Sequence, residues 1–309
     1  MTGGGRVPTW VCGRTDHARP RYIPPVIPTT IRPMRPADVD AATAIVLAGD
    51  WGDRREFFSF VTAHAACRPI VAERDGELVG TGVGTVNGPV GWIGTIFVAN
   101  DARGRGLGRA LTEAVQDRLR DAGCRTEVLV ATSAGRPLYE RLGFEEQCWY
   151  RTVEAPGTNG TAAAAIDSIV PVVRAFLPED LPEMADLDRA ATGEDRRHLL
   201  RAFANQSSAK CLVRPDGTLR GFVVRAPWGG GATVAVDNDD AFRLLEARRQ
   251  AAGPAKTVRA GVVDLNAAGI SLLERAGWNE AWRAVRMVRG DPLRWAPERI
   301  WGQFNHALG

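Results

Sequence analysis

The clearest hydrophobic patterns lie next to each other in the first half of the chain. Residues 92–98 are apolar and rich in β-branched side chains, which predicts a buried strand. Between residues 107 and 122, apolar side chains recur every three or four positions, which predicts an amphipathic helix. These side chains are Leu107, Leu111, Ala114, Val115, Leu119 and Ala122. Because a glycine-rich turn joins the two segments, the sequence predicts a strand, a turn and a helix N-terminus in succession.

The same order of patterns occurs twice along the chain. One motif is a short strand followed by a proline turn and an acidic helix start; the next is a hairpin around Asp-Gly, and the last is a helix end at glycine. The corresponding segments are 31–39 with 173–181, 70–80 with 211–221, and 138–144 with 272–278. Three matches in the same order indicate a tandem duplication.

Each half therefore predicts a mixed-sheet α/β domain: strand, helices, hairpin, strand, helix, strand, helix and a final pair of strands. We expect a flexible arm over residues 1–29, a first domain over 30–155, a linker over 156–167 and a second domain over 168–309. The linker is rich in Ala, Gly and Thr and lacks periodicity. Apolar residues between 292 and 308 predict a helix that docks over the interface of the two domains.

Composition narrows the class of protein. The chain has 309 residues, 45% of them hydrophobic, and a net charge of only +3, so neither a general nucleic-acid role nor a membrane role is indicated. No apolar run approaches the ~18 residues of a membrane helix, and the start of the chain lacks a secretory signal. Five cysteines without CxxC spacing and four scattered histidines indicate reduced thiols, no metal site and a cytoplasmic location.

The glycine-rich turn carries the strongest chemical signal. Its glycines let the backbone adopt left-handed angles and approach a ligand closely, and its amides point out of a helix end, where an anion is stabilised. Arginines add fixed positive charge. The residues concerned are Arg103, Gly104, Arg105, Gly106, Leu107, Gly108 and Arg109. The turn is therefore predicted to bind a pyrophosphate.

Spacing narrows the choice of pyrophosphate ligand. A nucleotide P-loop needs Gly-Lys-Ser/Thr, and a dinucleotide fingerprint needs G-x-G-x-x-G; neither is present here. The pattern Arg-x-x-Gly-x-Gly at Arg103, Gly106 and Gly108 does fit, and with it the chain resembles the GNAT acyltransferase superfamily. The resemblance covers residues 30–155 strongly, and 168–290 only through the repeat and the order of strands. It implies two tandem GNAT-like domains, each with a mixed, mostly antiparallel sheet flanked by helices.

The resemblance also implies site residues in the first half. Strand residues Ile96, Phe97 and Val98 would pair with the pantetheine arm of acetyl-CoA, and Thr132 and Ser133 would open the following helix near the coenzyme. Tyr139 matches the tyrosine that protonates the departing thiolate, which suits a phenol that is neutral at pH 7. The alternative for Tyr139 is a structural role, packed on the sheet.

The acceptor site is less well marked. A general base is expected for an amine acceptor, but residues 90–98 contain no acid. The remaining candidates for the acceptor pocket are Asp50, Trp51, Asp53 and Glu56. A solvated, charged turn that leads into a helix packed on the sheet explains the same stretch equally well.

The second half is altered where the first carries its chemistry. Residues 234–242 replace the phosphate loop and place three aspartates at a helix start, where they would repel a pyrophosphate. Leu273 stands at the position of Tyr139, although Asn266 keeps an asparagine that the first half has as Thr132. We expect this half to have lost coenzyme binding, and to support the first half or close over its acceptor site.

These observations predict an acetyl-CoA-dependent N-acetyltransferase that acts on a small-molecule amine by direct attack, through the first domain. No cysteine occupies a nucleophile-like position. Three alternatives remain: a non-catalytic acyl-CoA sensor or assembly module, a tandem enzyme like mycothiol synthase (whose intact loop lies in the second half), and nucleic-acid binding through the Arg-Gly run. A homodimer is left open. The identity of the acceptor and the length of the acyl group cannot be read from the sequence.

Overall fold

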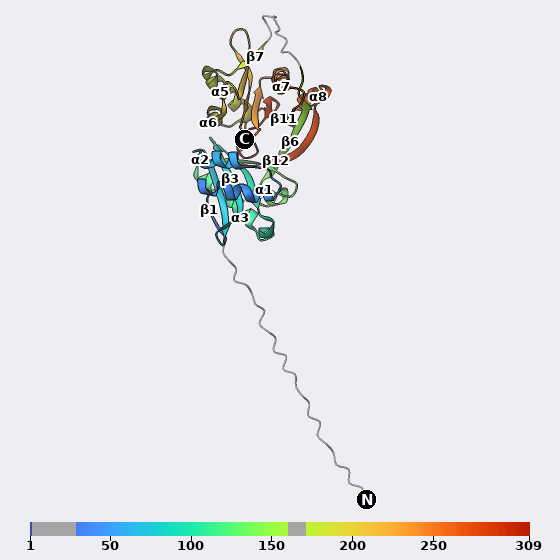
Figure 1. Cartoon of the computed structure of the whole chain (residues 1–309). Helices are drawn as coiled ribbons and strands as arrows, with labels where there is room; N and C mark the ends of the chain where they lie inside the picture. The colour runs from blue at the N-terminus through green and yellow to red at the C-terminus, as the bar shows by residue number, and fades with distance from the viewer. Residues whose placement is uncertain (2–28, 160–170) are drawn as a thin grey trace.

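The computed structural model describes Met1 and residues 29–159 and 171–309. The described chain forms two lobes that meet along a broad junction, and the C-terminal residues lie at this junction (Figure 1). Both lobes combine a β-sheet with flanking helices, which confirms the predicted α/β class with two GNAT-like domains. Most of the predicted N-terminal arm (residues 2–28) and of the predicted linker (residues 160–167) lie outside the described residues.

The first lobe begins with the predicted strand, helices and hairpin. Its strands are β1 (Thr30–Pro33), β2 (Cys67–Arg74), β3 (Glu77–Asn87), β4 (Val90–Val98), β5 (Thr126–Ala131) and β6 (Glu145–Pro156). Its helices are α1 (Val39–Ala48), α2 (Arg55–Ala63), α3 (Leu107–Asp121) and α4 (Arg136–Arg141). Helices α1 and α2 pack with Val71, Val83 and Phe97 on one face of the sheet, and α3 packs with Ile70 and Ile93 on the other. The strand and the helix predicted on either side of the glycine-rich turn are both confirmed.

The second lobe repeats this order, with shorter strands at β8, β9 and β10 than at β2, β3 and β4. Its strands are β7 (Val172–Ala175), β8 (Ala209–Val213), β9 (Leu219–Arg225), β10 (Gly231–Ala235), β11 (Thr257–Val263), β12 (Asn279–Gly290) and β13 (Ile300–Gly302). Its helices are α5 (Leu181–Thr192), α6 (Arg197–Phe203), α7 (Asn238–Ala252) and α8 (Ala267–Arg275). Both Asp-Gly hairpins form as predicted, with Gly76 and Gly217 at positive φ.

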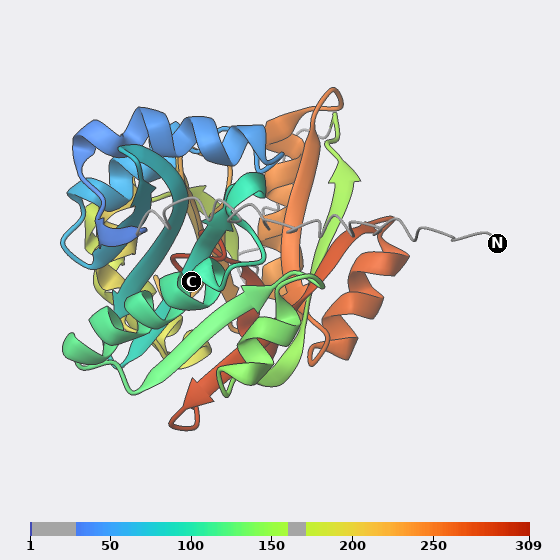
Figure 2. The ribbon, with the colours of Figure 1, turned by 90° about the horizontal axis from the view of Figure 1, so that it is seen from below.

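The two halves exchange strands. The larger sheet has the order β1-β2-β3-β4-β5-β12-β6-β11, so β12 of the second half lies between β5 and β6 of the first half. In return β6 pairs with β11, from Thr257 opposite Pro156 to Val263 opposite Tyr150. Figure 2 shows the long red β12 running beside the green strands. The predicted pair of strands at the end of each half is therefore wrong: each half supplies one long strand, and its partner comes from the other half.

Strands β4 and β5 pair over only half of β4. Residues Val90–Ile93 pair in parallel with Thr126–Leu129, and the two strands separate beyond that point. At the separation β4 has an irregularity in its register with β3, and Thr95 adopts a φ of 52°. A β-branched residue at positive φ costs ~1–3 kcal/mol and is typical of functional sites. The separation of the two strands therefore coincides with a strained backbone in β4, which is typical of a functional site.

The C-terminal segment differs from its prediction. Instead of a docking helix over 292–308, it forms a 3-10 turn, Pro297–Arg299, and then strand β13. Pro297 disfavours a continuous helix, and Trp301 is completely buried with its indole N–H donating to the carbonyl of Glu298 at 3.1 Å. The predicted docking at the interface is nevertheless observed, because β13 pairs with β10 and the residues after it enter the junction.

One apolar core crosses the junction of the lobes. Phe57 and Phe60 of α2 contact Trp228 at ring-centroid distances of 5.5 Å, and the ring of Phe60 lies tilted against that of Phe203 of α6 at 4.7 Å. Phe304 of the C-terminal segment continues the cluster. Burial of these aromatic side chains in one cluster fixes the second half against the first.

Buried polar groups also join the lobes. Glu194 accepts hydrogen bonds from the side chains of Asn87 and Trp92, both at 2.8 Å, and Asn87 donates as well to the carbonyl of Leu308. Burial raises the pKa of Glu194, although nearby arginines oppose this shift. The junction is therefore a packed and hydrogen-bonded interface.

Candidate active site

The glycine-rich turn lies at the N-terminus of α3, as predicted. Gly104 and Gly106 adopt φ values of 76° and 81°, and a Cβ built on either would meet nothing within 4 Å. Both residues therefore need glycine for their backbone angles, while the space around them stays open. Gly106 is the N-cap of α3, and no side chain caps this helix end.

The amides of the turn are available to a ligand. Within the described part of the chain, no main-chain or side-chain acceptor bonds to the N–H groups of residues 104–109. The first turn of α3 also contains no acidic residue. A helix end with free amides and an uncompensated dipole stabilises an anion such as a phosphate.

The arginines of the turn lie differently from one another. Arg103 folds back so that its Nε donates to the carbonyl of Val98 at 2.9 Å, and its guanidinium lies over the ring of Phe97. Arg109 pairs with Glu113 one helical turn later, at 2.8 Å on the surface. Arg103 therefore connects the turn to the end of β4, where the strands separate.

A cavity of about 670 Å³ opens between the separated strands and the second lobe. From the predicted site it is lined by Ile96, Thr132 and Tyr139, and from the predicted acceptor region by Asp50 and Trp51. The structure therefore brings together residues that lie far apart in the sequence. Phe97, Val98 and Ser133 do not line this cavity; Phe97 is buried beneath Trp51, with ring centroids 5.4 Å apart.

Tyr139 is held on the short helix α4. This helix begins at Arg136, later than the predicted start at Ser133, after a turn in which Thr132 Oγ1 accepts from the amide of Gly135 at 3.2 Å. A Cβ on Gly135 would lie 3.2 Å from the ring of Tyr139, so the ring lies close above this turn. Burial raises the pKa of Tyr139 to about 12, which keeps its hydroxyl protonated at neutral pH.

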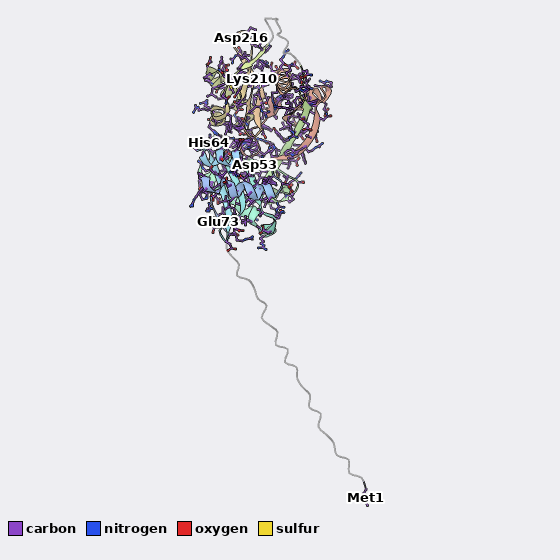
Figure 3. The ribbon with its side chains drawn as sticks, viewed as in Figure 1. Met1, Asp53, His64, Glu73, Lys210 and Asp216 are labelled. Carbon is purple, nitrogen blue, oxygen red and sulfur yellow. The ribbon has the colours of Figure 1, made fainter. Side chains whose placement is uncertain are left out.

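The predicted acids of the acceptor region differ in whether they line the cavity. Asp50 lines the cavity and adopts a φ of 62°, another strained backbone at the same site. Asp53 is exposed and accepts from the amide of Arg55 at the start of α2; it is labelled in Figure 3 near the junction of the lobes. Glu56 is also exposed, and neither residue lines the cavity. Of the three candidate bases, which are all exposed, Asp50 alone lines the cavity.

Within residues 171–309, the second half has no equivalent of the open turn. At the start of α7, Asp237 caps the helix by accepting from the amide of Asp240 at 2.9 Å. Arg220 pairs with both carboxylates, at 2.6 and 2.7 Å. This helix end already carries negative charge, and one of its amides is already hydrogen-bonded. It would therefore stabilise a bound anion much less than the start of α3 does.

The opening beside β10 is also filled. In the order of the repeat, Thr233 and Val234 stand where the first half has Ile96 and Phe97, and β13 pairs with these two residues. Trp301 packs against α8, where a Cβ on Gly269 would lie 2.7 Å from the indole. The chain's own C-terminal segment thus occupies the groove that the first half leaves open.

Several residues that line the cavity were not found from the sequence. They come from the second half, the exchanged strands and the C-terminal segment: Tyr150, Thr152, Trp228, Arg248, Arg259, Trp282, Gln303 and His306. Thr95 and Arg54 of the first half line it too. The only sequence signal among the second-half residues was Trp228, which precedes three glycines in a predicted hairpin turn. Most of the acceptor side of the cavity is therefore assembled by long-range contacts.

Comparison with known proteins identifies the fold. Residues 40–144 match the acetyltransferase (GNAT) family, and residues 184–302 match a second acetyltransferase (GNAT) domain. The chain belongs to the GNAT acetyltransferase family. Within this family it is 34% identical over 133 residues to the aminoglycoside N(6')-acetyltransferase type 1 of Stenotrophomonas maltophilia, a match that covers 38% of this chain and 86% of that enzyme. The chain is thus a GNAT acetyltransferase with two domains in tandem.

Solved structures support the same architecture over most of the chain. A protein from Pyrococcus horikoshii described as an acetyltransferase is 20% identical, with a TM-score of 0.75, covering 91% of this chain and 96% of its own. A tandem GNAT protein from the clavulanic acid biosynthesis pathway is 14% identical, with a TM-score of 0.57 and coverages of 86% and 99%. At these identities the likeness concerns the fold alone.

Neither a metal site nor a membrane-spanning helix is found among the described residues. No group of three or more His, Cys, Asp or Glu side chains in residues 29–159 and 171–309 is arranged to hold a metal ion. In the same residues no helix is long and apolar enough to cross a membrane. The four described cysteines are buried and form no disulfide, and Cys12 lies outside the described residues.

Proposed function

We propose that this GNAT protein transfers an acetyl group from acetyl-CoA to the amine of a small molecule, and that the first half carries out the reaction. The observation that carries the proposal is the start of α3. There, free amides, two glycines at positive φ and an absence of acid meet next to the opening between β4 and β5. In this arrangement the amides of residues 104–109 would bind the pyrophosphate, and the pantetheine arm would lie along Ile96, Phe97 and Val98.

The cavity supports the chemistry that follows. An amine that enters from the second lobe would meet the thioester beside Tyr139. When the amine nitrogen forms its bond to the acetyl carbon, the carbon–sulfur bond breaks and the sulfur takes a proton from the Tyr139 hydroxyl. The attacking nitrogen loses a proton in the same reaction, which balances the one that Tyr139 gives. Asp50 is the carboxylate best placed to receive it.

The small-molecule acceptor is supported by two observations. The cavity is lined by residues of both lobes and has the ~300–1,000 Å³ volume of a pocket for a small ligand. The Stenotrophomonas relative is named for its action on an aminoglycoside, which is itself a small amine. The proposal does not extend to that particular substrate.

The test is turnover and binding measured on the same protein. We expect acetyl-CoA to bind in calorimetry, and free coenzyme A thiol to be released above background with at least one amine in a broad panel. Tyr139→Phe should lower kcat by about 100-fold, because the general acid is lost, and should leave the affinity for acetyl-CoA unchanged. Binding without turnover of any amine would favour the acyl-CoA sensor, and absence of binding would refute both functions.

A further inference from the structure

The charges that line the cavity do not suit a polycation. Of its charged side chains, Arg54, Arg248 and Arg259 are positive and only Asp50 is negative. Arg259 is neutralised by Glu154, at 2.9 Å. Among residues 29–159 and 171–309, no carboxylate lies within 4 Å of the guanidinium of Arg54 or Arg248. The cavity therefore presents two uncompensated cations to whatever fills it.

Arg248 is held in place without an anion. It lies on α7, and its Nη2 donates to the carbonyl of Arg259 at 2.8 Å. Its Nε is buried and has no hydrogen-bond partner among the described residues. Burial lowers the pKa of Arg248 to about 10, and the charge of Arg225 adds to this effect. A buried guanidinium without a carboxylate is costly unless a ligand supplies the missing charge.

Other buried polar atoms that line the cavity also lack hydrogen-bond partners among the described residues. Trp228 Nε1, Gln303 Oε1 and His306 Nδ1 are buried without partners in the described part of the chain, and all three residues line the cavity. Burial lowers the pKa of His306 to about 4, with Arg286 and Arg54 adding to the shift, so its ring adds no charge at neutral pH. The indole N–H of Trp228 can donate to a bound anion, whereas Gln303 Oε1 is an acceptor and suits the acceptor's ammonium group. The site therefore holds unused hydrogen-bonding groups as well as unused positive charge, which is typical of a binding pocket for a polar ligand.

From these unpaired groups we infer that the acceptor carries an anionic group, a carboxylate or a phosphonate-like group, which binds Arg248 and is attracted also by the charge of Arg54, while its amine faces Tyr139. The acceptor class is thus an amino acid-like molecule and not a polycationic aminoglycoside. A planar guanidinium binds either anion through paired N–H donors, and Asp50 is the one carboxylate in the cavity that can attract the ammonium. This inference rests on the proposed function, because it assigns the acceptor of the same site.

The experiment compares acceptors in matched sets at saturating acetyl-CoA. Amino carboxylic acids and aminoalkylphosphonates of several chain lengths are each tested beside the corresponding uncharged amide or amine, and kanamycin serves as the polycation. We expect kcat/KM to be at least 10-fold higher for an anion-bearing amine than for its uncharged partner. The carboxylate and phosphonate arms show which anion is used. Equal or better turnover of the uncharged amines or of kanamycin would overturn the inference.

Variants connect this preference to the arginines. Arg248→Gln should raise KM for the preferred anionic acceptor at least 10-fold more than it raises KM for the uncharged partner, and Arg54→Gln should act in the same direction. Arg243→Gln is the matched control, since Arg243 lies on the same helix, is exposed and does not line the cavity. An unchanged affinity for acetyl-CoA shows that each variant is folded. If Arg248→Gln does not fold, Arg54→Gln decides alone.

Failure of this inference and failure of the proposed function are distinguishable. Calorimetry with the same acids, on the protein saturated with coenzyme A, measures the anion site without turnover. If coenzyme A binds but no anion-bearing amine does, or if the wild type and Arg248→Gln bind these acids equally, the anion site is refuted and the coenzyme site stands. If acetyl-CoA does not bind at all, the proposed function itself fails.

Discussion

The starts of helices α3 and α7 are equivalent positions in the two halves of the duplication. They differ in which groups accept hydrogen bonds from their amides. At α3, glycines with positive φ leave the amides free and no acid lies in the first turn. At α7, Asp237 caps the helix and Arg220 neutralises the local negative charge. The same strand-turn-helix unit thus offers an anion site in one half and an internally satisfied helix in the other. A few side chains at a helix start are enough to produce this difference.

The grooves beside the turns differ in the same sense. Beside β4 the residues after Gly94 line the cavity, whereas beside β10 the corresponding residues pair with β13. The second half therefore uses the groove to fix a segment that lines the acceptor side of the first half's cavity. A domain can lose the residues that bind a ligand and keep a positioning role through the same groove.

The largest expected effect comes from closing the open turn. Gly106→Asp would place a carboxylate at the proposed pyrophosphate site and strain a residue with a φ of 81°. We expect acetyl-CoA affinity to fall at least about 1,000-fold, or ~4 kcal/mol, in calorimetry. Gly217→Asp is the matched control, because Gly217 has a φ of 88° and equally open space in a hairpin of the second half. Unchanged affinity in Gly106→Asp would remove the turn from the proposed mechanism.

A second substitution tests whether the filled groove has a structural role. Trp301→Ala should lower the free energy of unfolding by ~3–5 kcal/mol in urea denaturation, because Trp301 is completely buried. Ile96→Ala, at the corresponding part of the open groove, should cost less than half as much, since Ile96 is only half-buried and lines the cavity. Similar losses for the two variants would contradict the assignment of the second groove as part of the core.

The smallest expected effect concerns Glu194, which joins the two halves through its hydrogen bonds to Asn87 and Trp92. Because the pKa of Glu194 is raised above its ordinary value of 4.5, folding favours its protonated form. The stabilisation that comes from protonated Glu194 is complete below pH 4.5, and it is lost as the pH rises through the raised pKa. We therefore expect the free energy of unfolding of Glu194→Gln, relative to the wild type, to increase with pH above 4.5, by at most ~1.4 kcal/mol per pH unit, and then to level off.

The control for this measurement is Glu77→Gln, whose carboxylate is exposed and makes no ion pair with the described residues. This variant measures how much of the change comes from removing one surface carboxylate. A constant difference between Glu194→Gln and the wild type across the same range would show that Glu194 ionises as easily in the folded protein as in the unfolded chain.

Features encoded locally could be predicted from the sequence. The turn around Gly104 and Gly106, the Asp-Gly hairpins and helix α3 depend on backbone preferences and periodicity within about fifteen residues, and all three formed as predicted. The three aspartates predicted at a helix start do lie at the start of α7, where Asp237 also caps the helix. Local chemistry of this kind needs no knowledge of the partner elements.

Features that depend on distant partners could not be predicted. β6 and β12 are both long strands, and nothing within either shows that β12 lies against β5. Once this exchange was missed, Tyr150, Arg248 and His306 could not be recognised as cavity residues. Which of Asp50, Asp53 and Glu56 lines the cavity also depends on the geometry of one turn. The sequence therefore could not separate Asp50, which lines it, from the other two.

The reciprocal exchange of β6 and β12 has a consequence for how this protein reaches its native state. Neither half can complete its hydrogen-bonded ladder until the other has been synthesised, so the two should melt in a single cooperative transition. An isolated N-terminal fragment would expose the bare edge of β5, a template for aggregation. Pairings this distant in sequence also slow folding, which makes the nascent chain a natural client for chaperones.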